Sequence, residues 1–239
     1  IMTKKRFITC HSYVQPEITY TMRVMEQFKE RGYDFNVNTF THILEGYKVA
    51  DKMKAHGASA STFSDWFMYK MEVNDAMSYN AAIMYKMGLN VCINSDDAEM
   101  ARRLNQEAAK IVKYGGVPET EAFKMVTLNP AKALHVDNKV GSIKVGKDAD
   151  VVLWSDNPLS IYAKSLYTIV DGTIYFDRAK DAAQSIKIAE ERNQLMQKML
   201  GDKKAGAPTR PATPSAQLLL QCADHADTEE ENILDNEKK

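Results

Sequence analysis

Two adjacent carboxylates follow an apolar run in residues 89–100, LNVCINSDDAEM. The run from Leu89 to Ile93 is typical of a buried strand, and Asp96 and Asp97 stand just beyond its end. One Asp could cap the helix that follows, because a cap side chain accepts hydrogen bonds from free backbone N–H groups. Asp97 is adjacent to that helix and is assigned to the cap, whereas Asp96 could equally be a metal ligand.

Two histidines stand at the ends of other expected strands. His11 follows residues 7–10, and His42 follows residues 35–40 after one intervening residue. The carboxyl ends of parallel strands meet at one edge of a sheet, so we expect His11, His42 and Asp96 to converge. His and carboxylate are common zinc ligands, and a water on such a metal can lose its proton to a carboxylate near neutral pH. A single His at a strand end can equally be a hydrogen-bonded loop residue, so the predicted metal site depends on all three positions together.

The elements that position these residues alternate between strand and helix. Gly32, Gly57 and Gly88 each end a helical stretch and lead directly into a strand. Glycine adopts the left-handed conformation after a helix at no steric cost. This repeated alternation with short returns predicts a parallel sheet covered by helices. The expected helices are residues 16–31, 47–56, 74–87, 98–114 and 118–128, and the expected strands are 7–10, 35–40, 58–63 and 89–93.

The pattern changes after residue 141. Short strands are expected over residues 149–154, 166–170 and 173–176, and Asp171-Gly172 between the last two is a strong hairpin signal. This indicates a small antiparallel unit. A charged amphipathic helix over 177–200 precedes a Pro/Ala/Lys-rich stretch that is typical of a disordered tail.

The bulk properties exclude several classes of function. The net charge of the 239 residues is −1, which gives no footprint for nucleic acid or an anionic membrane surface. No apolar stretch approaches the roughly 20 residues of a membrane span. Three widely spaced cysteines argue against a disulfide framework. The sequence assigns no compartment.

Three side chains outside the expected site have structural interpretations. His56, in the last turn of a helix, is interpreted as a surface residue that compensates the helix dipole. His135 follows a helix end and is interpreted as structural. Glu107 is placed on the polar face of the helix over 98–114.

The segment "TLNPAKALHVDNKVGSIKVGKDADVVLWSDNPLSI", followed by "TIVDGTIYFDR", resembles the C-terminal region of the amidohydrolase superfamily, especially its imidazolonepropionase-like members. Upstream, "FITCHS", "TFTHILEG" and "VCINSDDAE" are similar to the ends of barrel strands five, six and eight, and "ASASTFSDW" to strand seven. The resemblance covers roughly residues 6–178. It implies an α/β fold that comprises the C-terminal half of a TIM (β/α)8 barrel and part of a small β-sandwich domain. The implied boundaries are 1–136 for the partial barrel, 137–178 for the composite β-sandwich, 179–200 for a C-terminal helix and 201–239 for a disordered tail.

The resemblance also implies a function. It predicts a metal-dependent hydrolase that cleaves a C–N bond in an amide, cyclic amide or peptide substrate. Asp96 matches the Asp that binds metal and takes the proton of the attacking water, and His11 and His42 match metal-ligating or carbonyl-polarising histidines. The expected cofactor is a divalent metal, with zinc first and iron or manganese as alternatives. Trp66 and Tyr69 follow strand seven, where the family places substrate contacts, although packing in an aromatic core fits each of them too.

One departure from the family pattern bears on the function. The His-x-His pair of the first barrel strand occurs nowhere in the 239 residues, and strands one to four have no counterpart. We therefore expect the N-terminal half of the barrel as a partner, and a half barrel with two unpaired edges could also form a homo-oligomer. The alternative function is a non-catalytic barrel fragment that serves as a binding or assembly module. An isolated doubly wound domain is a weaker alternative, since no G-x-G-x-x-G loop follows any strand.

Overall fold

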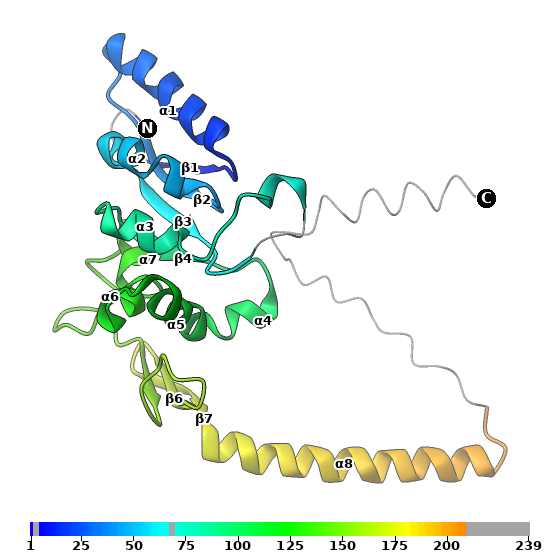
Figure 1. Cartoon of the computed structure of the whole chain (residues 1–239). Coiled ribbons are helices and arrows are strands. Elements are labelled where there is room, and N and C mark those ends of the chain that lie inside the picture. Colours follow the sequence, from blue (N-terminus) through cyan, green and yellow to red (C-terminus); the bar gives the residue numbers. More distant parts are fainter. Residues whose placement is uncertain (2–4, 67–69, 209–239) are drawn as a thin grey trace, which may run out of the picture. The chain divides into compact units, whose positions relative to one another are not determined.

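The computed structural model describes residues 1, 5–66 and 70–208. The chain divides into two units, residues 1–179 and 180–239. The first unit has a mixed α/β fold with one parallel and one antiparallel sheet (Figure 1). The predicted domain boundaries at residues 136 and 178 stay predictions.

The parallel sheet confirms the expected β/α alternation. Its strand order is β1-β2-β3-β4, and each neighbouring pair is parallel. A doubly wound domain reverses its strand order at a switch point, and this sequential order has no such reversal. The strands are β1 (Ile8–His11), β2 (Val37–Thr41), β3 (Ser59–Thr62) and β4 (Val91–Ile93).

Helices connect these strands and continue beyond β4. Gly57 ends α2 with a φ of 82°, and Gly32 and Gly88 also have positive φ, as their positions before strands predict. The helices are α1 (Gln15–Glu30), η1 (Gly46–Lys48), α2 (Ala50–His56), η2 (Met71–Val73), α3 (Asn80–Lys86), α4 (Ala98–Ala101), α5 (Leu104–Gly115), α6 (Glu119–Lys124) and α7 (Leu128–Ala133).

Four of the expected helices are shorter than predicted or divided, and two of these are α2, which begins at Ala50, and α6, which ends at Lys124. The stretch over 98–114 is interrupted at Arg102 and Arg103, so α4 and α5 are separate helices. The stretch over 74–87 becomes helical only at Asn80, whose side chain accepts from the Tyr47 N–H (2.8 Å) and donates to the Ile43 carbonyl (2.7 Å). These tertiary hydrogen bonds determine where α3 begins, and no local pattern encodes them.

A continuous apolar core joins α1, α2, α3 and α5 to the parallel sheet. Its fully buried members include Ile18, Met53, Met84 and Ile111 from the helices and Phe40 from β2. A second, smaller cluster consists of residues that follow the strand ends. It contains Leu44, Phe63, Val73 and Met100, with Tyr13 and Trp66 packed against it.

Two histidines outside the candidate site have structural roles. His56 is only 6% exposed, and its Nε2 accepts a hydrogen bond from the Val37 N–H (3.1 Å), so the interpretation of a surface residue is wrong. The start of β2 needs this acceptor, because Val37 is fully buried. His135 bonds Asn38 Oδ1 through Nε2 (2.7 Å) and stacks on Phe7, which confirms its structural interpretation.

The antiparallel sheet has the order β5-β6-β7, with β5 at Val151–Trp154, β6 at Ser165–Val170 and β7 at Thr173–Asp177. Asp171 and Gly172 join β6 to β7 with φ values of 49° and 75°. Positive φ at both central residues is the geometry of a type I′ turn, so the predicted hairpin is confirmed.

Helix α8 (Arg178–Lys204) has 27 residues and buries none of them. The sequence predicted a helix that ends at residue 200, and α8 continues past that residue to Lys204. Within the described part of the chain, no helix combines the length and apolar character that crossing a membrane requires.

Candidate active site

The structure brings the three predicted strand-end residues together. His11 is the last residue of β1, His42 follows β2 directly, and Asp96 lies three residues after β4. His42 Nε2 lies 2.8 Å from Asp96 Oδ1, and the ring centroids of His11 and His42 are 4.9 Å apart. The arrangement therefore has the convergence that parallel strand ends predict, while the roles of the three side chains stay predictions.

His42 has an unusual backbone and an unsatisfied ring nitrogen. Its φ is 60°, in the left-handed region, which costs a residue with a Cβ about 1–2 kcal/mol. Its ring stacks on Phe63 at 5.5 Å between centroids, with 18° between the planes. Its buried Nδ1 has no hydrogen-bond partner among the described residues. Strain and an unpaired buried polar atom at one residue are typical of a functional position.

The two adjacent aspartates, Asp96 and Asp97, have different hydrogen-bond partners. Asp97 Oδ1 accepts from the backbone N–H groups of Glu99 (2.8 Å) and Met100 (2.9 Å), which confirms the predicted cap of α4. The carboxylate of Asp96 instead contacts His42 and is 29% exposed, so a small molecule can reach it.

The environment of His11 favours its neutral form. Burial lowers the pKa of His11, and the neighbouring His42 lowers it further. The ring of Tyr13 packs edge-on against it at 4.6 Å. A neutral imidazole is the form that can bind a metal ion, so the lowered pKa of His11 favours its ligating form.

The donor set fits part of a metal-coordination shell. Two ligand atoms of one tetrahedral zinc ion lie about 3.4 Å apart. The contact between His42 and Asp96 is 2.8 Å, so a modest separation of the two side chains would suit both as ligands. As the described residues stand, no group of three or more His, Cys, Asp or Glu side chains is placed to hold a metal ion. A complete shell therefore requires a rearrangement or further ligands.

Trp66 and Tyr69 are the two aromatic residues predicted to contact substrate. Trp66 is partly buried and packs on Phe63 at 4.8 Å within the second apolar cluster, as aromatic core packing requires. Its contact with substrate stays a prediction. Tyr69 lies outside the described residues.

A buried charged group beside the site was missed. Glu107 is fully buried in α5, so its assignment to a polar helix face is wrong. Its carboxylate accepts hydrogen bonds from Ser64 and Lys110. Burial lowers the pKa of Lys110, but hydrogen bonds to Asp65 and Glu107 outweigh it and leave the pKa above its usual value. Glu107 lies three residues after Leu104 and four before Ile111, on the buried face of α5, so the assignment to the polar face followed from its charge and not from its position.

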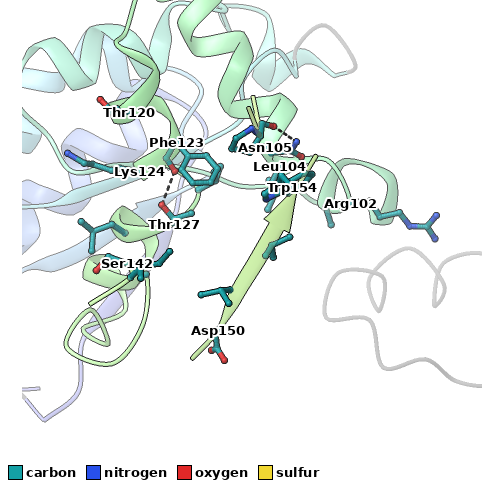
Figure 2. Close-up of a pocket in the computed structure, with 18 residues that line it drawn as sticks. Arg102, Leu104, Asn105, Thr120, Phe123, Lys124, Thr127, Ser142, Asp150 and Trp154 are labelled. Carbon is teal, nitrogen blue, oxygen red and sulfur yellow. Dashed lines mark hydrogen bonds between the residues drawn. The ribbon is translucent and has the colours of Figure 1, made fainter. Parts of the chain in front are cut away.

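A cavity of about 820 Å³ has a lining of its own (Figure 2). Its lining combines residues of α5 and α6, including Leu104 and Phe123, with Trp154 and other residues of β5. Asn105 spans from α5 to the loop after β5 by donating to the Pro158 carbonyl (2.6 Å). The lining includes none of the three strand-end residues, so this cavity is separate from the candidate active site.

The fold and the strand-end residues place the chain among β/α proteins whose sites lie at the carboxyl ends of parallel strands. The chain belongs to the amidohydrolase family, because the model of that family matches residues 23–183. The match includes His42 and Asp96, whereas His11 precedes it.

Individual relatives agree with this family. The chain is 29% identical over 165 residues to the amidohydrolase tasK of Hapsidospora irregularis, a match of 66% of this chain and 17% of tasK. It is 65% identical over 34 residues to the imidazolonepropionase of Shewanella frigidimarina, which covers 14% of this chain and 8% of that enzyme. The crystal structure of an amidohydrolase from Thermotoga maritima matches with a TM-score of 0.65 and 27% identity, over 74% of this chain and 45% of that one. The chain thus spans less than half the length of these three relatives.

Proposed function

We propose that this chain contributes the histidine–aspartate part of the active site of a metal-dependent amidohydrolase. The reaction is hydrolysis of a C–N bond in a small amide, cyclic amide or peptide. The observation that carries the proposal is the 2.8 Å contact between His42 Nε2 and Asp96 Oδ1 at the strand ends of a chain in this family.

Asp96 is the proposed proton carrier. It accepts the proton of the attacking water and delivers it to the leaving nitrogen, which needs a carboxylate within hydrogen-bond reach of both. The contact with His42 orients this carboxylate, and Asp97 cannot replace it because its Oδ1 is occupied by the cap of α4. His42 polarises the substrate carbonyl or serves as a ligand.

The proposed metal ligands are His11, His42 and Asp96. When bound, a divalent metal lowers the pKa of water and polarises a carbonyl group. Nitrogen and carboxylate donors suit zinc best, and iron and manganese accept the same donors. The lowered pKa of His11 supports this assignment, since a protonated imidazole cannot ligate a metal.

The remaining ligands would come from the N-terminal half of a (β/α)8 barrel. Four parallel strands in sequential order are what half of such a barrel would contain, and the chain spans 45% of the Thermotoga maritima amidohydrolase, which supports this proposal. Strands β1 and β4 are the two edges of the described sheet. An unpaired edge strand has free backbone N–H and C=O groups that can pair with a strand of another chain. A second copy of this chain is the alternative partner at these edges.

A non-catalytic binding or assembly module is the second candidate function. It is favoured by one observation, that the described residues hold no group of three potential ligands. A module of this kind needs no metal and no proton carrier, so the two candidates differ in metal affinity and in the effect of changing Asp96.

Zinc titration of the purified chain by calorimetry tests the proposal. We expect Asp96→Asn to weaken zinc binding by about tenfold or more, because a ligand contributes at least as much as its supporting residues. Asp97→Asn is the matched control, since it removes one charge from the neighbouring position but keeps a good cap. Equal zinc affinity of Asp96→Asn and the wild-type chain would contradict the role of Asp96. A wild-type chain that binds no zinc alone would mean half a site, and the titration is then repeated on the chain assembled with an N-terminal half, where a lack of zinc binding would favour the assembly module.

A further inference from the structure

A buried charge cluster connects α5 to the loop that leaves β3. Glu107 is 1% exposed at its side chain, and its carboxylate accepts a hydrogen bond from the hydroxyl of Ser64, itself only 2% exposed. Lys110 Nζ donates to both oxygens of Glu107 (3.0 and 2.8 Å) and to Asp65 Oδ1 (2.9 Å). Two consecutive residues after β3 are therefore bonded to one turn of α5.

The charges of this cluster compensate one another. Glu107 and Asp65 supply two negative charges, and Lys110 and Arg103 supply two positive charges, with Arg103 Nε 3.5 Å from Glu107 Oε1. A carboxylate in the interior is costly to desolvate unless it is paired and hydrogen-bonded, and here every one of these partners is in reach. A hydrophobic residue could fill the same volume without this cost, so stability alone gives no reason for a carboxylate at this position.

The same loop packs directly on His42. Phe63, which precedes Ser64, is 2% exposed and stacks on the His42 ring at 5.5 Å. The backbone just after His42 is also held by β3, because Thr62 Oγ1 donates a hydrogen bond to the carbonyl of Ile43, the residue after His42 (2.6 Å). The position of the His42 ring therefore depends on where the β3 exit loop is held.

We propose that Glu107 is a positioning residue of the candidate active site, which through Ser64 holds Phe63 against His42 and so keeps the His42 ring in contact with Asp96. The role of the site rests on the proposed function, but the positioning itself is a property of the folded chain. This positioning requires an oxygen of Glu107 that accepts the hydrogen bond from Ser64, more than it requires the negative charge of Glu107.

The resonance of His42 Hε1 in a carbon–proton NMR spectrum of the full chain tests this inference. The signal is assigned by its loss in His42→Gln, and the stacked Phe63 ring shifts it from its random-coil position. Ser64→Ala removes the hydroxyl, and Glu107→Leu removes the acceptor. We expect both variants to move the signal toward the random-coil position. Glu107→Gln keeps an oxygen acceptor and should restore most of the wild-type shift.

Ile111→Val is the control for a merely structural role. Ile111 is fully buried on α5, one turn after Glu107, and contacts neither Ser64 nor Asp65 through any hydrogen bond. This variant should lower the thermal midpoint without moving the His42 signal. A His42 signal that stays at its wild-type position in Ser64→Ala, the mildest of the changes, would overturn the inference. So would an equal displacement in Ile111→Val.

Zinc titration of the same samples separates this inference from the proposed function. If the wild-type chain binds zinc, Ser64→Ala should weaken that binding severalfold while Glu107→Gln stays closer to wild type. If the wild-type chain binds no zinc alone but the His42 signal still moves as expected, the positioning role stands, and the metal-dependent function fails only if the chain assembled with an N-terminal half also binds no zinc.

Discussion

At the scale of single residues, the site depends on how two neighbouring carboxylates are used. Asp97 is occupied by two backbone N–H groups of α4, so only Asp96 has a carboxylate directed at His42. The pattern of residues 95–97 predicted this division, because the residue next to a helix start is the one that can cap it. The left-handed backbone of His42 was not predictable, since nothing in the local sequence requires a positive φ there.

The cap has a consequence for stability that can be measured. Asp97→Ala should lower the free energy of unfolding by about 0.5–2 kcal/mol, because two N–H groups at the start of α4 lose their acceptor. Asp97→Asn should be nearly neutral, since Asn caps about as well as Asp. Urea denaturation of both variants beside the wild-type chain measures the difference, and equal effects of Ala and Asn would contradict the cap.

His56 makes stability depend on pH. Burial lowers the pKa of His56 below its ordinary value of 6.5, so the folded state binds this proton less readily than the unfolded state. Protonation also removes the acceptor for the Val37 N–H. The contribution of His56 is therefore complete above pH 6.5 and is lost progressively as the pH falls from 6.5 to the lowered pKa.

The comparison of wild type with His56→Gln isolates this effect. His11 also has a lowered pKa, but it is present in both proteins and its contribution cancels in the difference. We expect the free energy of unfolding of the wild-type chain to fall more steeply than that of His56→Gln between pH 7 and pH 5. Parallel pH profiles would show that His56 does not titrate in this way.

At the scale of elements, the parts of the fold encoded locally were predictable. The glycines at 32, 57 and 88, the apolar strands and the Asp171-Gly172 turn all act through nearby residues, and the structure contains each of these elements. The parts that depend on distant contacts were not. The start of α3 depends on bonds from Asn80 to residues 33 and 37 positions away. The burial of Glu107 depends on Ser64, 43 positions away.

The glycine that ends α2 gives a test at this scale. Gly57 has a φ of 82°, so Gly57→Ala should lower the free energy of unfolding by about 1–2 kcal/mol. Gly201 lies within α8 without a positive φ and with no heavy atom within 4 Å of an added Cβ, so Gly201→Ala should not destabilise the chain. Thermal unfolding followed by circular dichroism compares them. A Gly57→Ala variant as stable as wild type would contradict the left-handed helix end.

At the scale of the whole molecule, the sheet and the relatives point to the same conclusion. The described sheet has four parallel strands with β1 and β4 at its edges, and the chain spans 17% of tasK and 45% of the Thermotoga maritima amidohydrolase. The first-strand His-x-His pair is absent from the sequence, so the proposed chemistry needs a second half that carries it. This need stays a prediction of the family resemblance, because composition and periodicity alone indicate only a β/α sheet.

The most direct test of the central claim is amide hydrolysis by this chain assembled with an N-terminal barrel half that carries the His-x-His pair. Initial rates are measured on a panel of cyclic and linear amides with wild type, Asp96→Asn and Asp97→Asn. We expect turnover by the wild-type assembly, a loss of about 100-fold or more in Asp96→Asn because a proton carrier is removed, and a rate close to wild type in Asp97→Asn. Unchanged turnover in Asp96→Asn, or a stable assembly that hydrolyses no amide, would contradict the proposed function.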